Sequence, residues 1–276
     1  MTISVNIILN MAFSVVICFG IPIIGMVIVS KKSKYMVGAF IAGCISFFVM
    51  QILIRIPLVQ LVMMNADFKD TWLTKIAIAV ILGLTAALFE TAGRLASMKW
   101  LITDKRAGYY TAVAHGLGHG GIEAALFVGI NYIIYIVIAI GLARVGTDAK
   151  LFSLFGATQQ QVLIEMFTET NPILFLVGGL ERGMVILFHV GMSVIMMTGI
   201  IKKQAGRYFL YVVGIHTLLD TTTVILGYLG ANYWLIEVFV GLFAVLSIFI
   251  VWSGEKTLED HLETTDEAEE AVKEGY

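Results

Sequence analysis

Ionisable side chains recur at helical spacing inside long apolar stretches of this chain. Glu90 and Arg94 are four residues apart, as are His115 and His119, and Glu123 follows His119 by four more. Since residues four apart share one face of a helix, each set forms a polar stripe. Carboxylates and imidazoles are common general acids and bases, and imidazoles also bind zinc. The spacing therefore indicates acid–base chemistry or a metal site between helices.

His189, His216 and Asp220 extend this pattern to two further apolar stretches. His216 and Asp220 are again four residues apart, and four of the five histidines fall in apolar stretches. A charged group at the bilayer centre costs at least about 2.5 to 3.5 kcal/mol on insertion scales, so such residues are functional candidates by default. A lone buried histidine usually makes only a structural hydrogen bond, but four histidines on three helices favour a functional polar site.

The depth of these groups along their helices predicts that they share one layer. Counted from the nearest basic loop residue at a rise of about 1.5 Å per residue, Glu90, His115 and His216 lie about 14 Å into the membrane. The same measure puts His189 and Asp220 at about 20 Å. We therefore expect a single site in the cytoplasmic half of a helix bundle.

The composition requires a membrane environment for these helices. Of the 276 residues, 59% are apolar and only 14% are charged, whereas soluble domains have about 45 to 50% and about 25%. Seven apolar runs reach the roughly 20 residues that cross a bilayer. They cover residues 3–29, 35–64, 73–98, 109–142, 172–200, 208–229 and 232–252. Because lipid tolerates only helices and closed barrels, the sequence predicts an all-α, polytopic transmembrane bundle of about seven spanning helices.

Basic residues predict which side of this bundle is cytoplasmic. Nine of them fall in three short loops on one side, and the positive-inside rule then places the N-terminus outside and the C-terminus inside. These nine residues are Lys31, Lys32, Lys34, Lys99, Lys105, Arg106, Lys202, Lys203 and Arg207. We expect the protein to reside in a bacterial cytoplasmic membrane.

The remaining segments complete the expected organisation. Residues 1–252 form the predicted integral membrane domain, with the core of the site in 73–229. Residues 253–276 form an acidic cytoplasmic tail, with nine carboxylates against two lysines, and are expected to be disordered or a solvated helix. Residues 144–171 mix apolar and polar positions, which predicts a helix lying in the outer interface.

The polar stretches, taken in order, resemble those of a known family. Residues 89–94 read FETAGR, residues 115–123 read HGLGHGGIE, and residues 216–220 read HTLLD, with His189 isolated between the last two. This order resembles the YhfC-like membrane peptidases. That family is related to the type II CAAX proteases and bacteriocin-processing enzymes, and it is distantly similar to the scaffold subunit of gamma-secretase.

The resemblance implies a role for each motif. In that group the first motif is EExxxR, a middle motif supplies a histidine, and the last motif is HxxxN or HxxxD. Glu90 and Arg94 match the second glutamate and the arginine of the first motif, and 216–220 matches the last. Either His115 or His119 would supply the middle histidine.

Phe89 is the departure from the family pattern. It stands where the group has its first glutamate, the residue expected to activate water. Glu90 or Glu123 must therefore take that role in this chain. The residue after His115 is Gly116, so the HExxH arrangement of zinc proteases is absent and does not supply a base either.

These patterns favour an intramembrane endopeptidase that hydrolyses a peptide bond in or near the inner leaflet. Glu90 or Glu123 would activate water, while Arg94 and Asp220 would hold the other groups in place. The histidines would orient the water, stabilise the oxyanion or bind zinc. The candidate catalytic residues are Glu90, Arg94, His115, His119, Glu123, His189, His216 and Asp220.

The sequence requires no cofactor, and zinc is the candidate metal. The stripes are explained without zinc, so the residues alone favour a metal-free glutamate mechanism over a zinc-bound water. The candidate metal ligands are His115, His119, His189 and His216.

Two other functions also fit an intramembrane polar cluster. Carboxylate and histidine chains form proton relays in transporters, although the polar groups thin out beyond Glu123. A non-catalytic membrane scaffold would use the stripes only for helix packing. The expected partners are a membrane-embedded or membrane-proximal peptide and the lipid bilayer. We expect no nucleic acid partner, and the oligomeric state does not follow from the sequence.

Overall fold

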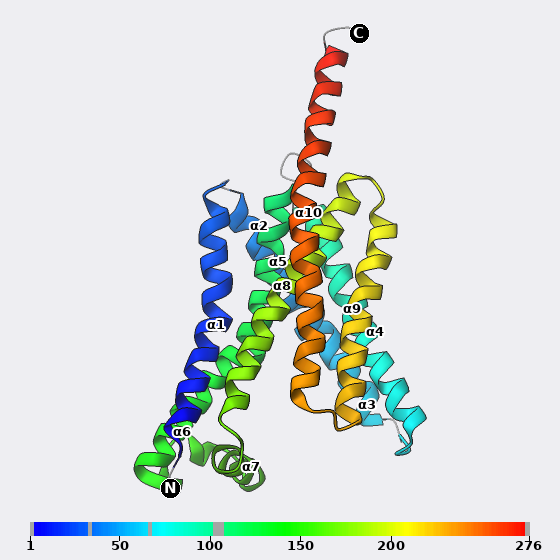
Figure 1. Ribbon diagram of the computed structural model, residues 1–276. Coiled ribbons are helices and arrows are strands. Elements are labelled where there is room, and N and C mark those ends of the chain that lie inside the picture. Colours follow the sequence, from blue (N-terminus) through cyan, green and yellow to red (C-terminus); the bar gives the residue numbers. More distant parts are fainter. Residues whose placement is uncertain (1–2, 33–34, 66–67, 102–107, 274–276) are drawn as a thin grey trace. The chain divides into compact units, whose positions relative to one another are not determined.

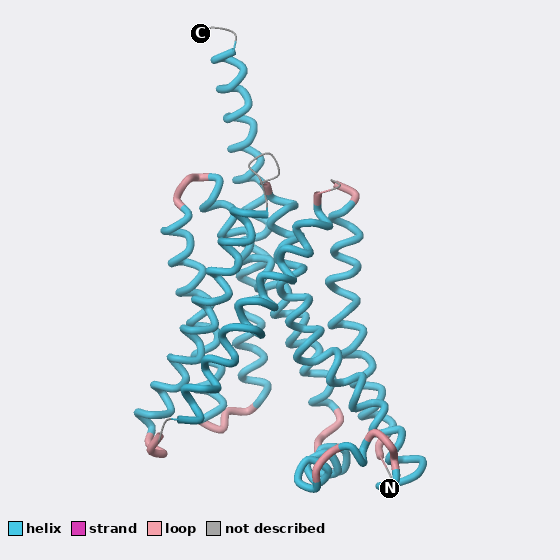
Figure 2. Tube along the Cα trace, turned by 180° about the vertical axis from the view of Figure 1, so that it is seen from behind, coloured by secondary structure: helices cyan, strands magenta, loops and turns pink. Residues whose placement is uncertain are grey.

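The computed structural model describes residues 3–32, 35–65, 68–101 and 108–273, with the backbone alone from residue 259 onward. Helices joined by short loops make up this part of the chain, and it contains no strand (Figure 2). Within it, seven helices are long and apolar enough to cross a membrane, which confirms the predicted all-α bundle. They cover Val5–Ser30, Met36–Asn65, Trp72–Trp100, Tyr109–Asp148, Ile173–Ile201, Ala205–Tyr228 and Tyr233–Leu258.

Residues 1–24 and 123–183 form one compact unit. Its helices are the first part of α1 (Val5–Ser30), then α6 (Ile130–Val145), α7 (Ala157–Thr168) and the beginning of α8 (Ile173–Ile201). The segment 144–171, predicted as one interfacial helix, instead makes two short turns, Gly146–Asp148 and Phe152–Leu154, before α7 begins. Its apolar side chains are tied into the core of this unit, whose buried members are Ile3, Ile7, Met11, Ile138, Ala139, Leu142, Ala149, Phe152, Leu163, Phe167 and Phe175.

Residues 25–122 and 184–276 form the second compact unit. Within this unit α4 packs against both α2 and α9, and α9 also packs against α10. The complete helices here are α2 (Met36–Phe47), α3 (Ile56–Asn65), α4 (Trp72–Leu101), α9 (Ala205–Tyr228) and α10 (Tyr233–Lys273). Most of α5 (Tyr109–Ala124) and the second part of α8 belong to it as well.

The acidic tail continues the last spanning helix. Figure 1 shows the end of α10 projecting past the neighbouring helices of its unit, and the helix continues to Lys273. Of the two expected states of the tail, the structure thus has the helix. Its cytoplasmic location and the orientation of the bundle stay predictions.

The second spanning helix changes form next to Pro57. Between α2 and α3 the chain makes a π-helical segment, η1 (Phe48–Arg55), in which the amide of Ile56 bonds the carbonyl of Gln51. Proline lacks an N–H, and its ring would clash with the carbonyl of Leu53 four residues back, so a regular α-helix is unfavourable here. The wider π turn accommodates this interruption, and such turns are frequent at functional sites.

Glycines bring α5 very close to its neighbours. A Cβ on Gly118 would lie 2.0 Å from the carbonyl oxygen of Phe40 in α2, and one on Gly116 would lie 2.4 Å from Cα of Val190 in α8. Only glycine permits such backbone contact between helices. Although glycine has low helix propensity, α5 runs unbroken through this glycine-rich stretch to Ala124.

Adding one methyl group at Gly118 should destabilise the protein. Replacing glycine by alanine ordinarily favours a helix by about 1 kcal/mol, but overpacking typically costs about 1 to 3 kcal/mol. We expect Gly118→Ala to lower the melting temperature in detergent. The matched control is Gly38→Ala in α2, where nothing lies within 4 Å of the added Cβ, and its melting temperature should be unchanged or higher. Equal melting temperatures for the two variants would contradict the packing described for α5.

Candidate active site

Glu90 lies within a buried group of histidines from three other helices. Its Oε2 is 3.1 Å from Nε2 of His119 on α5 and 3.9 Å from Nε2 of His216 on α9. The ring of His189 on α8 is centred 4.7 Å from that of His119 and 5.5 Å from that of His216. All four side chains are buried. The structure thus brings together Glu90 and three of the four histidines for which the sequence predicts a single site.

Arg94, one turn beyond Glu90 on α4, holds His189 in a fixed orientation. This arginine is fully buried. Its Nη2 lies 3.0 Å from Nδ1 of His189, and its Nε donates to Oγ of Ser193 at 3.1 Å. Since arginine can only donate, Nδ1 of His189 accepts, and a neutral His189 carries its ring proton on Nε2. His189 is then a donor toward any oxygen bound at Nε2.

His115 joins the same network one helical turn away from His119. Its Nε2 is 2.8 Å from Oγ of Ser97, and its Nδ1 is 3.3 Å from Oγ of Ser193. Ser97 also donates to the carbonyl of Arg94, so its oxygen accepts from His115. With both ring nitrogens engaged by serines, His115 ties α4, α5 and α8 together.

Ser46 of α2 controls the proton arrangement at His119. Its Oγ is 2.8 Å from the carbonyl of Gly43 and 3.1 Å from Nδ1 of His119. The hydroxyl has one proton to give. When it donates to Gly43, Nδ1 of His119 is the donor, and Nε2 and Glu90 hold one proton between them. When it donates to His119 instead, Nε2 carries the ring proton and donates to the Glu90 carboxylate.

His216 is held at one edge of the group and keeps one nitrogen open. Its Nε2 is 3.4 Å from Oδ2 of Asp220, four residues along α9, as the predicted stripe requires. Its ring meets Phe188 edge to face at 5.3 Å between centroids. Nδ1 is buried and has no hydrogen-bond partner among the described residues. An imidazole with an open nitrogen can bind a metal or a substrate group.

Glu90, His189 and His216 fit a metal ion. One potential ligand atom from each lies within 4.8 Å of the other two, and all three side chains are buried. Two imidazoles and one carboxylate are also the donor set of some catalytic zinc sites. His115 and His119, the other candidate ligands, are not members of this group, and serines and Glu90 engage their nitrogens. Metal binding at Nε2 of His189 would require the ring proton to lie on Nδ1 instead, so Arg94 could then no longer donate to that nitrogen.

Glu123, the other candidate base, is engaged elsewhere. Its Oε1 accepts from Nη1 of Arg182 at 3.0 Å, and Arg182 also pairs with Glu181. These three residues belong to the first compact unit, whereas the histidine group belongs to the second. The contacts of the two carboxylates therefore favour Glu90 as the base.

The sequence prediction considered only ionisable residues and therefore missed three serines of the network. Ser97 follows Arg94 by three residues, and Ser193 follows His189 by four, so both continue polar stripes along their own helices. Including hydroxyls in the spacing rule would have found them. Ser46 has no polar neighbour at helical spacing in α2, and only the close approach of α2 and α5 reveals its contact.

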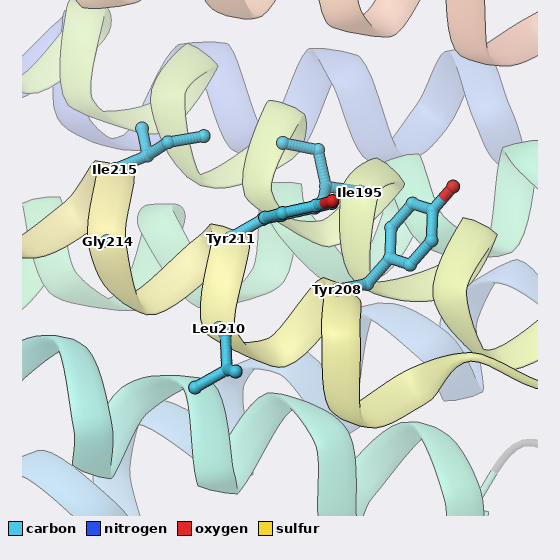
Figure 3. Close-up of a pocket in the computed structure, with 6 residues that line it drawn as sticks. All are labelled: Ile195, Tyr208, Leu210, Tyr211, Gly214 and Ile215. Atoms are coloured by element: carbon cyan, nitrogen blue, oxygen red, sulfur yellow. The ribbon is translucent and has the colours of Figure 1, made fainter.

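A cavity of about 460 Å³ between α8 and α9 lies apart from this chemistry. Its lining contains no carboxylate or imidazole. Figure 3 shows the residues that line it, which are Ile195, Tyr208, Leu210, Tyr211, Gly214 and Ile215. It offers an apolar surface with two phenol groups and no acid–base pair.

Comparisons with known proteins agree with the motifs. A family model described as YhfC intramembrane metalloprotease matches residues 17–240, which include every residue of the histidine group. The "Uncharacterized membrane protein YhfC" of Bacillus subtilis (strain 168) is 26% identical over 258 residues, covering 90% of this chain and 96% of that protein. No solved structure matches the chain.

Proposed function

The chain belongs to the YhfC intramembrane metalloprotease family, and we propose that it hydrolyses peptide bonds of membrane-embedded substrates at Glu90. The proposal rests chiefly on one observation. Glu90 is buried in contact with His119 and grouped with His189 and His216 inside an apolar bundle. A base, a metal-binding donor set and hydrogen-bond donors in one water-poor site are the parts that hydrolysis needs.

Glu90, His189 and His216 would hold the metal ion that the family description implies. When bound, such an ion supplies Lewis-acid polarisation of a peptide carbonyl and of water. The family description thus favours a metal, against our preference from the residues alone for a metal-free mechanism. Zinc is the metal that the donor set suits best.

The Glu90–His119 pair is the proton acceptor in this proposal. In the base form, Ser46 donates to Nδ1 of His119, and Nε2 of His119 donates to the Glu90 carboxylate. The Glu90 carboxylate of the pair takes a proton from the attacking water, while Nε2 of His119 keeps its own proton and Ser46 continues to donate to Nδ1. The pair then returns its proton to the leaving amine, so one side-chain pair serves as base and acid.

Arg94 and the serines position the remaining groups. In the metal-free protein the guanidinium keeps Nδ1 of His189 as an acceptor, and Ser193 links the same guanidinium to His115. Such fixed donors are effective because they need little reorganisation as charge develops. Asp220 holds His216 through the 3.4 Å contact at Nε2.

Cleavage of membrane peptides by purified protein tests the proposed function. The protein is reconstituted in lipid vesicles with a library of apolar helical peptides, and new termini are identified by mass spectrometry. Hydrolysis predicts peptide products that depend on Glu90. A transporter would move protons or solute across the vesicle membrane without products, and a scaffold would do neither.

Removing His216 should strip the metal from the protein. Replacing groups that merely support a ligand typically weakens metal binding by about 10- to 100-fold, so loss of a ligand should do at least as much. We expect His216→Gln to lose bound metal, measured by elemental analysis of purified protein. His261→Gln in the acidic tail is the matched control and should keep the full amount. Equal metal content in the two variants would show that the ion binds elsewhere.

A further inference from the structure

Gln51 is a buried amide whose oxygen lacks a partner. It lies in η1 and is only 6% exposed. Its Oε1 accepts no hydrogen bond within the described part of the chain. An unsatisfied buried acceptor typically costs about 1 to 3 kcal/mol, and buried polar atoms of folded proteins are normally paired. The amide is therefore placed to accept a hydrogen bond from a group that enters the site.

Where η1 packs on α4, Gln51 lies at the same level as Glu90. On one side of Gln51, a Cβ on Gly93 of α4 would meet the side chain of Met50 at 2.6 Å. On the other side, Nη2 of Arg55 donates to the carbonyl of Leu82 at 2.6 Å. Gln51 lies between these contacts along η1, at the level of the stretch of α4 that contains Glu90.

A small cavity lies between η1, α3 and α4. Its volume is about 160 Å³, well below the roughly 300 to 1,000 Å³ of pockets that hold whole small ligands. One large apolar side chain suits such a space. The lining comes from η1, α3 and one face of α4, namely Arg55, Leu58, Val59, Val62, Met63, Ile81, Thr85 and Phe89.

Two residues that line the cavity, Phe89 and Arg55, connect it to the cluster at Glu90. Phe89, which departs from the family motif, forms part of its wall and directly precedes Glu90. Arg55 interacts electrostatically with both Glu90 and Asp220. Its guanidinium is anchored by Leu82 and by Oγ1 of Thr85 at 3.3 Å. An apolar pocket next to a reacting carboxylate is the arrangement by which hydrolases select a side chain.

We propose that η1 and α3 form the substrate subsite, in which Oε1 of Gln51 accepts a backbone N–H of the peptide. The cavity between Val59 and Phe89 holds the large apolar side chain next to the bond presented to Glu90. This inference rests on the proposed function and names its substrate class, which is a peptide segment with a large apolar residue at the cleavage site. A peptide fits both features, because an acyl chain could fill the cavity but has no N–H for Gln51.

Photo-crosslinking tests the subsite without requiring catalysis. The probe is an apolar helical peptide carrying a diazirine analogue of leucine at each position in turn, bound to full-length Glu90→Gln protein in nanodiscs. We expect adducts on residues 58–63 or on Phe89 from one probe position. Val59→Trp should fill the cavity and remove the adduct. The matched control Val37→Trp, at a valine of α2 that is 50% exposed and outside the cavity, should keep it.

Cleavage kinetics give the second measurement. Val59→Trp should lower kcat/KM by about tenfold or more for peptides with leucine or phenylalanine at the site, but not for those with alanine. Gln51→Met keeps the side-chain length and removes the acceptor, so it should lower kcat/KM by about three- to tenfold for all peptides. Val37→Trp should match the unmodified protein for every peptide.

The outcomes separate the subsite from hydrolysis itself. Adducts in the cavity without any cleavage by the unmodified protein would support the subsite and overturn the proposed function. Cleavage that ignores Val59→Trp, with adducts elsewhere, would overturn the subsite and keep the proposed function. Adducts that survive Val59→Trp would also overturn the subsite.

Discussion

Glu90→Gln should abolish peptide cleavage while leaving the helix bundle folded. Glutamine keeps the size of the side chain and a hydrogen bond to His119, but it cannot take a proton from water. Its neutral amide also binds a metal less well than a carboxylate. Positioned acid–base catalysis typically contributes about 10² to 10⁴ in rate, so cleavage should fall by at least that range. The measurement is the rate of product formation in lipid vesicles, with thermal unfolding recorded for the same preparation.

Two other glutamates of the spanning helices show whether the loss of cleavage is specific to Glu90. Glu237→Gln on α10 removes a carboxylate outside the histidine group and should leave the rate unchanged. Glu123→Gln tests the rival base, and its ion pair with Arg182 predicts that cleavage continues. Loss of cleavage in Glu123→Gln together with normal cleavage in Glu90→Gln would move the base to Glu123.

Arg94→Met should cause the second large loss, in both stability and cleavage. Methionine keeps most of the buried stem but leaves Nδ1 of His189 and Oγ of Ser193 without their donor. Hydrogen bonds to a charged group contribute about 1.5 to 3 kcal/mol each. The melting temperature should therefore fall markedly. Arg94→Lys keeps the charge but cannot reproduce a rigid fork of donors, so it should restore only part of the loss.

The protonation of His189 distinguishes positioning from simple structural support. Nitrogen-15 NMR of labelled histidine should report an unprotonated Nδ1 and a protonated Nε2 in the unmodified, metal-free protein. In Arg94→Lys, which is expected to fold, the preference for this tautomer should weaken. A variant that loses cleavage with the His189 spectrum unchanged would contradict the role assigned to Arg94.

The helices were predictable because their cause is local. Long apolar runs and the requirement to satisfy backbone groups in lipid already specify seven spanning helices. Helical periodicity likewise predicted the common faces, as His216 and Asp220 show on α9. The close packing of the α5 glycines against Phe40 and Val190 was not predictable, because the partner helices are not visible in the local sequence.

The partners within the site were less predictable because they depend on contacts between helices. Spacing placed His115 and His119 on one face equally well, but only tertiary packing gives His119 the contact with Glu90 and His115 the two serines. Glu123 shares that spacing and is nevertheless engaged by Arg182. Gln51 gave no signal in the sequence, because its burial depends on how η1 packs on α4.

Hydrolysis in water enriched in oxygen-18 tests whether Glu90 activates water for peptide cleavage. Purified, metal-replete protein is incubated with a membrane peptide that it cleaves, and the new carboxyl terminus is weighed by mass spectrometry. We expect one oxygen-18 atom in that carboxyl group from the unmodified protein and from Glu237→Gln, with no product from Glu90→Gln. Labelled product from Glu90→Gln at the unmodified rate, or no product from folded, metal-replete protein against the whole peptide library, would contradict this role of Glu90.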